Sequence, residues 1–417
     1  MARVPQVVII GGGFAGLAAA RQLKDVACEV TIVDRHNHHV FQPLLYQVAT
    51  AGLSPGDIAS PIRWILRKQP RVRVLLGTVE RIDTAAKQVW MDGQDALAYD
   101  YLIVAAGATH SYFGHGEWST AAPGLKTLDD ALAIRRRLLL AFEEAEREHN
   151  AVLQRRLLTF VIIGGGPTGV EMAGALAEIA RQALRSEFDA IDPASARILL
   201  IEAGPSILPA FPADLRASAK RALRRLGVEV REGTAVTQVE EGRVFLGTER
   251  IDAHTILWAA GVAAAPLGRD LGPELDRAGR VIVAPDLSAP GHAGVFVAGD
   301  LASFSHQTGK PLPGVAQVAI QQGAQAARNI GRLIRGEATR PFHYIDPGNM
   351  ATIGRANAIA DFGFIRVSGF MGWLVWLFVH ILFLIGFRNR LSVLLQWGAA
   401  YLTYQRSVRL ITRNQGS

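Results

Sequence analysis

The chain has 417 residues, 49% of them hydrophobic and 19% charged, which excludes a disordered or fibrous protein and leaves room for two or three domains. Its net charge of +7 is compatible with nucleic acid, anionic lipid or an anionic substrate as partner. Because Cys28 is the only cysteine, one chain cannot build a disulfide framework or a cysteine-based metal cage.

The N-terminus enters an apolar strand, Val7 to Ile10, without the basic segment, apolar stretch and cleavage site of an export signal, so we expect the catalytic part to stay in the cytoplasm. The strand is followed by Gly11, Gly13 and Gly16 and an alanine-rich helix. In this spacing the first glycine makes a tight turn, the second lets the main chain approach a pyrophosphate, and the third lets the helix pack on the strand. Asp34 closes the next strand and is placed to accept hydrogen bonds from an adenosine ribose.

Two further strands end in Ala-Ala-Gly, at Ala106-Gly107 and at Ala260-Gly261, where small residues let the backbone pass close to a ligand. Arginines in helix-like sequence predict solvated helix faces; they are Arg135, Arg136 and Arg137, then Arg221, Arg224 and Arg225. No basic stretch is interleaved with aromatic residues in the way of a nucleic-acid platform. Dinucleotides and lipid headgroups therefore explain the positive charge better than nucleic acid does.

The glycine pattern returns after a second strand, Phe160 to Ile163, as Gly164, Gly166 and Gly169. Glu202 closes the following strand, as Asp34 does in the first copy. An acid there favours NADH over NADPH, because a 2′-phosphate would meet like charge. The sequence therefore predicts an α/β fold with two Rossmann-type dinucleotide-binding domains.

The strand from Val295 to Val297 ends at Gly299-Asp300 and has no twin in the second copy. This asymmetry predicts that the first domain is completed by chain that returns after the second one. From Phe370 to Phe387 the only strongly polar side chain is His380. A run of this kind is near the roughly 18 residues of a membrane-spanning candidate and must be covered by lipid or protein.

After Arg390 apolar and polar residues alternate at helical spacing, and three basic residues follow. The apolar positions are Leu391, Leu394, Leu395, Gly398 and Leu402, the polar ones Ser392, Gln396 and Thr403, and the basic ones Arg406, Arg409 and Arg413. The apolar run is long enough for a transmembrane span, and the partly amphipathic helix with its basic end is also compatible with a membrane surface.

These motifs together resemble the type II NADH:quinone oxidoreductases, single-subunit respiratory NADH dehydrogenases that hold FAD and do not pump protons. The resemblance runs nearly end to end and rests on Gly11 to Leu17, Phe41 to Gln47, Gly164 to Glu171, Val297 to Asp300 and Ala316 to Gly323. It implies that Asp300 binds the flavin ribityl chain, that Gln317 and Gln321 lie between flavin and quinone, and that Glu171 lies near the nicotinamide. It also favours peripheral attachment over a transmembrane span.

Neutral amides such as Gln317 and Gln321 suit a quinone because they can hydrogen-bond its carbonyl oxygens without a fixed charge. Glu171 is equally well interpreted as an acid in the first turn of its helix, where the helix dipole favours a carboxylate. His380 is either a proton donor to reduced quinone or an interfacial residue with a satisfied hydrogen bond, and the second interpretation is favoured.

The expected catalytic residues are Glu171, Gln317 and Gln321. The expected cofactor-binding residues are Gly11, Gly12, Gly13, Phe14, Ala15, Gly16, Asp34, Arg35, Pro43, Val79, Ala106, Gly107, Gly164, Gly166, Gly169, Glu202, Gly261, Gly299, Asp300, Ala316 and Gln317. The expected domains are FAD-binding at 1–118 and 284–345, NADH-binding at 119–283, and membrane-anchoring at 346–417.

The expected partners are NADH, a membrane quinone, the bilayer surface and a second copy of the chain, with the enzyme peripheral on the cytoplasmic face of the cell inner membrane. No metal is expected, because His36, His38 and His39 lack a carboxylate or thiolate cluster to complete a site.

Four alternatives compete with this interpretation. Disulfide reductases and sulfide:quinone oxidoreductases need a pair of redox cysteines and are excluded. A soluble ferredoxin or rubredoxin reductase would have no use for the apolar run from Phe370 to Phe387. A non-catalytic membrane flavoprotein scaffold would not need the second glycine motif, which is intact.

Overall fold

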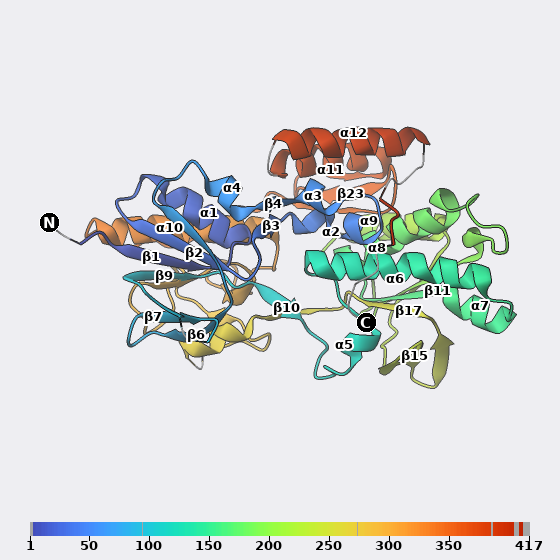
Figure 1. Ribbon diagram of the computed structural model, residues 1–417, viewed down its shortest axis with the longest axis horizontal. Coiled ribbons are helices and arrows are strands. Elements are labelled where there is room, and N and C mark those ends of the chain that lie inside the picture. The colour runs from blue at the N-terminus through green and yellow to red at the C-terminus, as the bar shows by residue number, and fades with distance from the viewer. Residues whose placement is uncertain (1–2, 94, 273, 385–386, 404–407, 412–417) are drawn as a thin grey trace. The chain divides into compact units, whose positions relative to one another are not determined.

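The computed structural model describes residues 3–93, 95–272, 274–384, 387–403 and 408–411. The chain forms two compact units (Figure 1). The first unit contains Met1–His39, Ala59–Thr109 and Val262–Pro347, and the second contains Val40–Ile58, His110–Gly261 and Gly348–Ser417. The three-part division into FAD, NADH and membrane regions stays a prediction.

A five-stranded parallel sheet in the order β20-β9-β1-β2-β5 forms the centre of the first unit. Its strands are β1 (Gln6–Ile10), β2 (Glu29–Asp34), β5 (Val72–Leu76), β9 (Tyr101–Val104) and β20 (Val295–Val297). All three residues of β20 are buried, and the strand pairs with β9, as Val295 opposite Leu102 shows. The predicted return of the chain into the first unit is therefore confirmed.

Two helices, α1 (Phe14–Gln22) and α10 (Ala316–Ile334), pack against each other in the first unit. Their contact depends on small residues, because a Cβ atom at Gly323 would lie 2.0 Å from the carbonyl oxygen of Ala15. The remaining elements of the first unit are β3 (His38–Val40), β4 (Ala59–Pro61), α4 (Ile62–Leu66), β6 (Val79–Asp83), β7 (Gln88–Met91), β8 (Asp95–Ala98), β10 (Ala108–His110), β18 (Val262–Ala264), β19 (Val281–Ile282) and β21 (Ala302–Ser303). The last residue of β3 and the last residue of β10 belong to the second unit.

The second unit repeats the arrangement with a four-stranded parallel sheet in the order β13-β12-β11-β17. Its strands are β11 (Thr159–Ile163), β12 (Arg197–Ile201), β13 (Val228–Arg231) and β17 (Thr255–Trp258). Its helices are α2 (Leu45–Ala49), α3 (Pro55–Ile58), α5 (Trp118–Ala121), α6 (Leu128–Arg147), α7 (Ala151–Leu157), α8 (Pro167–Glu178) and α9 (Ala213–Arg225). Every residue of β11 is buried, as expected for a central parallel strand.

The arginines of α6 only partly form the expected solvated face, since Arg136 is exposed and Arg137 is half-buried. Arg135 is buried, and its Nη1 forms no hydrogen bond with a described residue. Burial lowers the pKa of the Arg135 guanidinium from its ordinary value. The prediction was wrong here because Arg135 lies on the buried face of α6, at helical spacing from Ala131 and Leu138.

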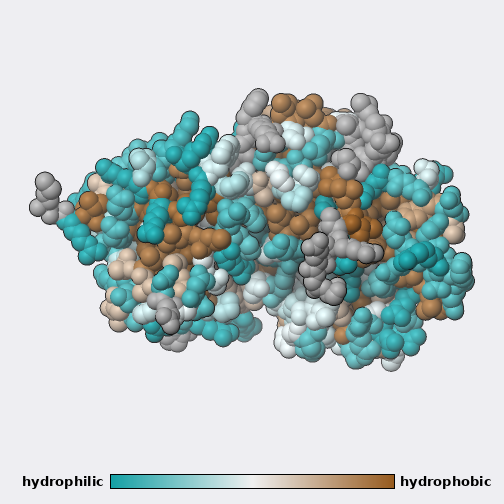
Figure 2. Space-filling view, viewed as in Figure 1, coloured by the Kyte–Doolittle hydropathy of each residue, from teal (hydrophilic) through white to brown (hydrophobic). Residues whose placement is uncertain are grey.

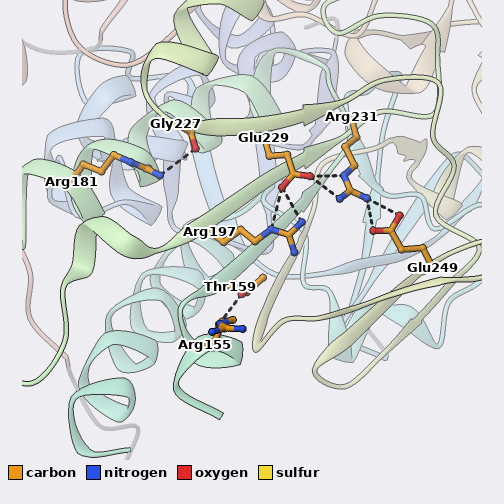
Figure 3. A network of polar contacts seen from close by, with 8 residues as sticks. All are labelled: Arg155, Thr159, Arg181, Arg197, Gly227, Glu229, Arg231 and Glu249. Atoms are coloured by element: carbon orange, nitrogen blue, oxygen red, sulfur yellow. Dashed lines mark hydrogen bonds and ion pairs between the residues drawn. The ribbon is translucent and has the colours of Figure 1, made fainter. Parts of the chain in front are cut away.

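A chain of ion pairs joins the edge of this sheet to the antiparallel sheet of β14 (Gln238–Glu240), β15 (Arg243–Leu246) and β16 (Glu249–Asp252) (Figure 3). Glu229 on β13 accepts hydrogen bonds from Arg197 and Arg231, and Arg231 donates to Glu249 at 2.7 Å. Exposed pairs of this kind contribute little to stability one by one, so the network adds little to the free energy of folding.

The C-terminal part of the second unit has a small antiparallel sheet, β22 (Asn349–Thr352), β23 (Ala358–Asp361) and β24 (Arg366–Ser368), followed by α11 (Gly369–Phe383) and α12 (Phe387–Thr403). The apolar run does not form one helix, because α11 ends at Phe383 and Leu384 is extended. Of the helices that the structure describes, none combines the length and the apolar character that a membrane crossing requires.

The polar side of α12 faces the protein. Ser392 and Gln396 donate hydrogen bonds to the buried carboxylate of Asp57 at 2.9 Å and 3.0 Å, whereas Leu394 and Leu395 are exposed. The side chains of Leu402 and Thr403, and the expected basic residues Arg406 and Arg413, lie outside the described residues. This amphipathic helix therefore presents its apolar side outward.

We expect Gly323→Ala to destabilise the protein by about 1–3 kcal/mol, because its new methyl group must push α10 away from the backbone of α1. Gly331→Ala in the same helix gains the same helix propensity, and its methyl group meets only the movable side chains of Val26, at 3.3 Å, and Arg335, at 3.6 Å. The melting temperature should fall for Gly323→Ala and not for Gly331→Ala. Equal melting temperatures would contradict the close contact.

Candidate functional site

The first glycine loop brings the end of β1 and the start of α1 into contact. A Cβ atom at Gly16 would lie 1.8 Å from the carbonyl oxygen of Gly11. Gly11 itself has φ +99°, and its Cβ would lie 2.3 Å from the oxygen of Ala105. Only glycine fits these two positions, as the motif predicted.

Asp34 closes this loop from the neighbouring strand. Its Oδ2 accepts a hydrogen bond from the Gly12 amide at 2.6 Å, and its Oδ1 accepts one from the His36 amide at 2.7 Å. The buried His39 ring lies 3.1 Å from the Gly12 oxygen, and burial lowers the pKa of His39 to about 4. The carboxylate is thus held beside the glycine loop and keeps lone pairs for a ribose hydroxyl.

The start of α1 is suited to a phosphate group. Gly13 caps the helix without a side-chain hydrogen bond, and the first turn holds no acidic residue. A Cβ atom at Gly13 would meet no atom within 4 Å, so the space in front of the helix is open. Amide groups that point into such a space attract a diphosphate. The residues present therefore fit the pyrophosphate of a dinucleotide.

The second loop has the same geometry. A Cβ at Gly169 would lie 1.9 Å from the oxygen of Gly164, and one at Gly166 would meet nothing within 4 Å. The Glu202 carboxylate accepts from the amides of Gly165 and Gly204, each at 2.6 Å. Helix α8 likewise begins without a side-chain cap or an acid in its first turn.

The Gly299-Asp300 turn lies in the first unit, between α1 and α10. Gly299 has φ +78°, and its amide donates to Oε1 of the buried Gln322 at 2.8 Å. Gln322 was not predicted, although its place on the face shared by Val318, Ala319 and Gly323 could have indicated a buried amide. This glutamine holds the turn that carries Asp300.

The two expected catalytic glutamines differ in their surroundings. The Gln321 amide donates to the carbonyl oxygen of Ile345 at 2.9 Å and accepts from its amide at 3.0 Å, so it braces the segment after α10. Gln317, in the first turn of α10 after Ala316, forms no hydrogen bond with a described residue. Gln317 is therefore the amide that remains available to a ligand.

The other expected cofactor residues divide between the units. The first unit contains the half-buried Val79, Ala106 and Gly107 and the exposed Arg35. It also contains Phe14, whose ring centre lies 4.9 Å from that of His39. Pro43 and Gly261 belong to the second unit, where a Cβ at Gly261 would lie 2.7 Å from the ring of Phe113. The contact between Phe113 and Gly261 was not predicted from the sequence.

Glu171 is not in the first turn of its helix, because α8 begins at Pro167. It is buried and accepts a hydrogen bond from the Thr352 amide at 3.4 Å. Burial raises the pKa of Glu171 to about 8, and the hydrogen bond only partly opposes this shift. The helix-dipole interpretation was therefore wrong, and at neutral pH the protonated form predominates.

A cavity of about 120 Å³ lies beside Glu171 within the second unit. Tryptophans form part of its wall, and the Trp376 Nε1 is buried without a hydrogen-bond partner among the described residues. Trp397 donates to Gln47 at 2.7 Å. Trp373 and Trp376 were missed because an apolar run indicates burial and not a cavity; Trp397, on α12, was missed because no local pattern places it beside them.

His380 adopts the favoured interpretation of a residue with a satisfied hydrogen bond. Its Nδ1 donates to the carbonyl oxygen of Trp376 at 2.8 Å, and the ring stacks on the Trp376 ring at 4.3 Å. Burial lowers the pKa of His380 to about 4, so the ring is neutral at neutral pH. His380 is therefore not positioned as a cationic proton donor.

Cys28 is buried, and burial raises the pKa of its thiol to about 11. A thiol of this kind is unreactive, in line with the exclusion of cysteine redox chemistry. Within the described ranges no three histidine, cysteine or acidic side chains gather as a metal site would require.

Residues 5–323 match the model of the pyridine nucleotide-disulphide oxidoreductase family, and residues 347–407 match that of the NDH2 C-terminal domain. The type II NADH:quinone oxidoreductase Ndh of Mycobacterium tuberculosis is 46% identical over 98% of this chain and 91% of its own length. The internal alternative NAD(P)H-ubiquinone oxidoreductase A1 of Arabidopsis thaliana mitochondria is 31% identical over 94% of this chain and 83% of its own length.

NDH2 from Plasmodium falciparum, solved in complex with NADH, superposes with a TM-score of 0.89 over 99% of this chain and 100% of the other, at 18% identity. The sulfide:quinone oxidoreductase of Aquifex aeolicus gives 0.71 over 93% of this chain and 92% of the other, at 20% identity. These likenesses show the fold, and the expected α/β architecture is confirmed.

The fold contains two glycine loops, and each is hydrogen-bonded to an acid at the end of the neighbouring strand. These features define an oxidoreductase of the class that binds two dinucleotides. Within the pyridine nucleotide-disulphide oxidoreductase family, the chain belongs to the type II NADH:quinone oxidoreductases. The resemblance found in the motifs is thereby confirmed.

Glu171→Gln tests the neutral state of the buried carboxyl. Folding favours protonated Glu171, so the wild type should lose stability relative to the variant as the pH rises from the ordinary pKa of 4.5 to about 8. Above that range the carboxyl is ionised in both states and the difference should stay constant. Melting temperatures across the range measure it, with Glu274→Gln as an exposed control. A pH-independent difference would show that Glu171 ionises normally.

Proposed function

We propose that this enzyme transfers a hydride from NADH to bound FAD and then two electrons to a membrane quinone, without pumping protons. The observation that carries the proposal is the duplicated loop, in which Asp34 and Glu202 each close an open, uncapped helix start. The intact second loop argues against a non-catalytic flavoprotein scaffold. The exposed apolar side chains of α11 and α12 argue against a soluble ferredoxin-type reductase.

The first unit binds FAD in this proposal. The amides after Gly13 hold the pyrophosphate, Asp34 accepts the adenosine ribose hydroxyls, and Asp300 binds the ribityl chain. The dinucleotide, when bound, supplies the redox chemistry, because flavin accepts a hydride and releases electrons one or two at a time. Gln322 supports the site indirectly by holding the Gly299 amide.

The second unit binds NADH. The open space at Gly166 receives the pyrophosphate, and the Glu202 carboxylate accepts the ribose hydroxyls and repels a 2′-phosphate. We assign Glu171 to the nicotinamide side, where a neutral carboxyl can both donate and accept a hydrogen bond. Gln317 donates to a quinone carbonyl, and Gln321 positions the segment beside it.

Gly13→Ala and Gly166→Ala separate the two nucleotide sites. Neither new methyl group meets protein within 4 Å, so both variants should fold, but each fills space assigned to a pyrophosphate. Gly13→Ala should bind FAD about tenfold more weakly or worse, since overpacking typically costs about 1–3 kcal/mol. Gly166→Ala should keep its FAD and need about tenfold more NADH for half-maximal flavin bleaching in stopped-flow measurements.

The matched control is Gly116→Ala, another glycine whose methyl group would meet nothing within 4 Å but which lies outside both loops. Reoxidation of the bleached enzyme by ubiquinone or menaquinone completes the cycle. A Gly13→Ala protein with full flavin content, or a wild type that NADPH bleaches as fast as NADH, would overturn the assignments.

We also propose peripheral attachment to the cytoplasmic face of the cell inner membrane through α11 and α12. Apolar side chains are exposed on both helices, and Figure 2 shows hydrophobic residues on the outer surface where these helices lie. The exposed residues are Phe370, Met371, Leu374, Phe378, Leu382, Phe383, Leu391, Leu394 and Leu395. Exposure of these apolar side chains is unfavourable in water and favourable in a membrane leaflet.

A homodimer is proposed from the family alone, and light scattering in detergent measures the oligomeric state.

Phe378→Asp combined with Leu395→Asp should release the enzyme from phosphatidylcholine vesicles. Both side chains are more than half exposed, so folding should not suffer, whereas burying two carboxylates in a leaflet is costly. We expect vesicle binding in flotation assays to weaken about tenfold or more, while the rate of NADH oxidation by ferricyanide stays unchanged. The control is Val152→Asp with Leu153→Asp on α7, and vesicle binding that survives in the α11–α12 variant would exclude this face.

A further inference from the structure

A basic surface on the first unit has no role in the nucleotide chemistry. No aspartate or glutamate occurs between Asp57 and Glu80, whereas five basic residues do. We call this surface the α4 surface; its basic residues are Arg63, Arg67, Lys68, Arg71 and Arg73, all exposed. Figure 2 shows hydrophilic side chains over the part of the first unit that carries α4. None of the five forms an ion pair with a described residue.

The α4 surface also contains an exposed indole. Trp64 is 46% exposed, and the Arg67 guanidinium lies 4.2 Å from the centre of its ring. Arg67 additionally donates to the Trp64 carbonyl oxygen at 2.6 Å. Tryptophan is enriched at membrane–water interfaces, because its ring is apolar and its N–H group is polar.

The opposite side of α4 fixes the orientation of this surface. Ile62 and Leu66 are buried, and Ile62 packs so closely on the first glycine loop that a Cβ at Gly12 would lie 2.4 Å from it. Arg63, Trp64 and Arg67 therefore project outward from an element anchored on the rigid core of the first unit. The cluster is held in place and is not a mobile tail.

Protection of a sheet edge explains only part of this charge. Strand β5 is an edge strand of its sheet, and basic residues such as Arg71 and Arg73 discourage pairing with another chain. Arg63, Trp64 and Lys68 lie before the strand and have no such use. A nucleic-acid surface is also disfavoured, because a single indole does not offer the series of stacking platforms that a single strand requires.

We infer that the α4 surface is a second membrane contact, which binds the anionic headgroups of the bilayer with Arg63, Arg67 and Lys68 while Trp64 enters the interface. This inference rests on the proposed membrane location and adds a lipid-charge preference to it. The apolar residues of α11 and α12 bind any leaflet, whereas the α4 surface favours a negatively charged one.

The test measures flotation of the full-length flavoprotein with vesicles of phosphatidylcholine, with or without phosphatidylglycerol. The α4 variant carries Arg63→Gln, Arg67→Gln and Lys68→Gln. The α9 variant, a control with the same loss of charge, carries Arg221→Gln, Arg224→Gln and Arg225→Gln, all exposed in the second unit.

Phosphatidylglycerol should strengthen wild-type binding, and added salt should weaken that gain. The α4 variant should bind the anionic vesicles about tenfold more weakly or worse and bind phosphatidylcholine as the wild type does. The α9 variant should behave as the wild type. Unchanged binding of the α4 variant to anionic vesicles, or an equal loss in the α9 variant, would overturn the inference.

Trp64→Ala tests the indole separately. It should reduce binding to anionic vesicles several-fold, while Leu153→Ala, an exposed apolar truncation on α7, should not. A single-stranded oligonucleotide that binds the wild type and competes with vesicles only through the α4 residues would assign the surface to nucleic acid instead. Quinone turnover in detergent is measured in parallel. Loss of turnover would contradict the proposed function, whereas loss of the lipid preference alone would contradict the inference about the α4 surface.

Discussion

The contact between the first and third glycine of each loop is the constraint on which the rest depends. A methyl group would lie 1.8 Å from a carbonyl oxygen at Gly16 and 1.9 Å at Gly169, so any other residue would move the helix away from its strand. The position of a helix start decides where its free amide groups point. The direction of the free amide groups at both helix starts therefore follows from this steric contact.

The two carboxylates repeat one arrangement with side chains of different length. Asp34 and Glu202 each accept from a loop amide with one oxygen and from the amide two residues further along the chain with the other. The same carboxylate–amide arrangement therefore occurs twice. What distinguishes the first unit is the returning chain, since β20 carries the Gly299-Asp300 turn to the end of the sheet and α10 packs on α1.

The sequence was sufficient for the parts of the fold that obey local rules. Strands β1 and β11, the glycine loops and their acids were predicted because steric demands act over a few residues. Glu171 was misjudged because its burial depends on Thr352, 181 residues later, on a hairpin that no local pattern connects to α8. The cavity tryptophans and the role of Gln322 were missed for the same reason. The residues that bind each cofactor stay predictions.

Helix α12 shows why a polar pattern alone does not give the orientation of a helix. A soluble amphipathic helix turns its apolar side inward, yet here Asp57 is buried and needs donors, which Ser392 and Gln396 supply. Satisfying that carboxylate leaves Leu394 and Leu395 exposed, an arrangement that water penalises and a leaflet does not. One buried acid thus determines which side of α12 is exposed, and replacing it would remove the reason for the inverted helix.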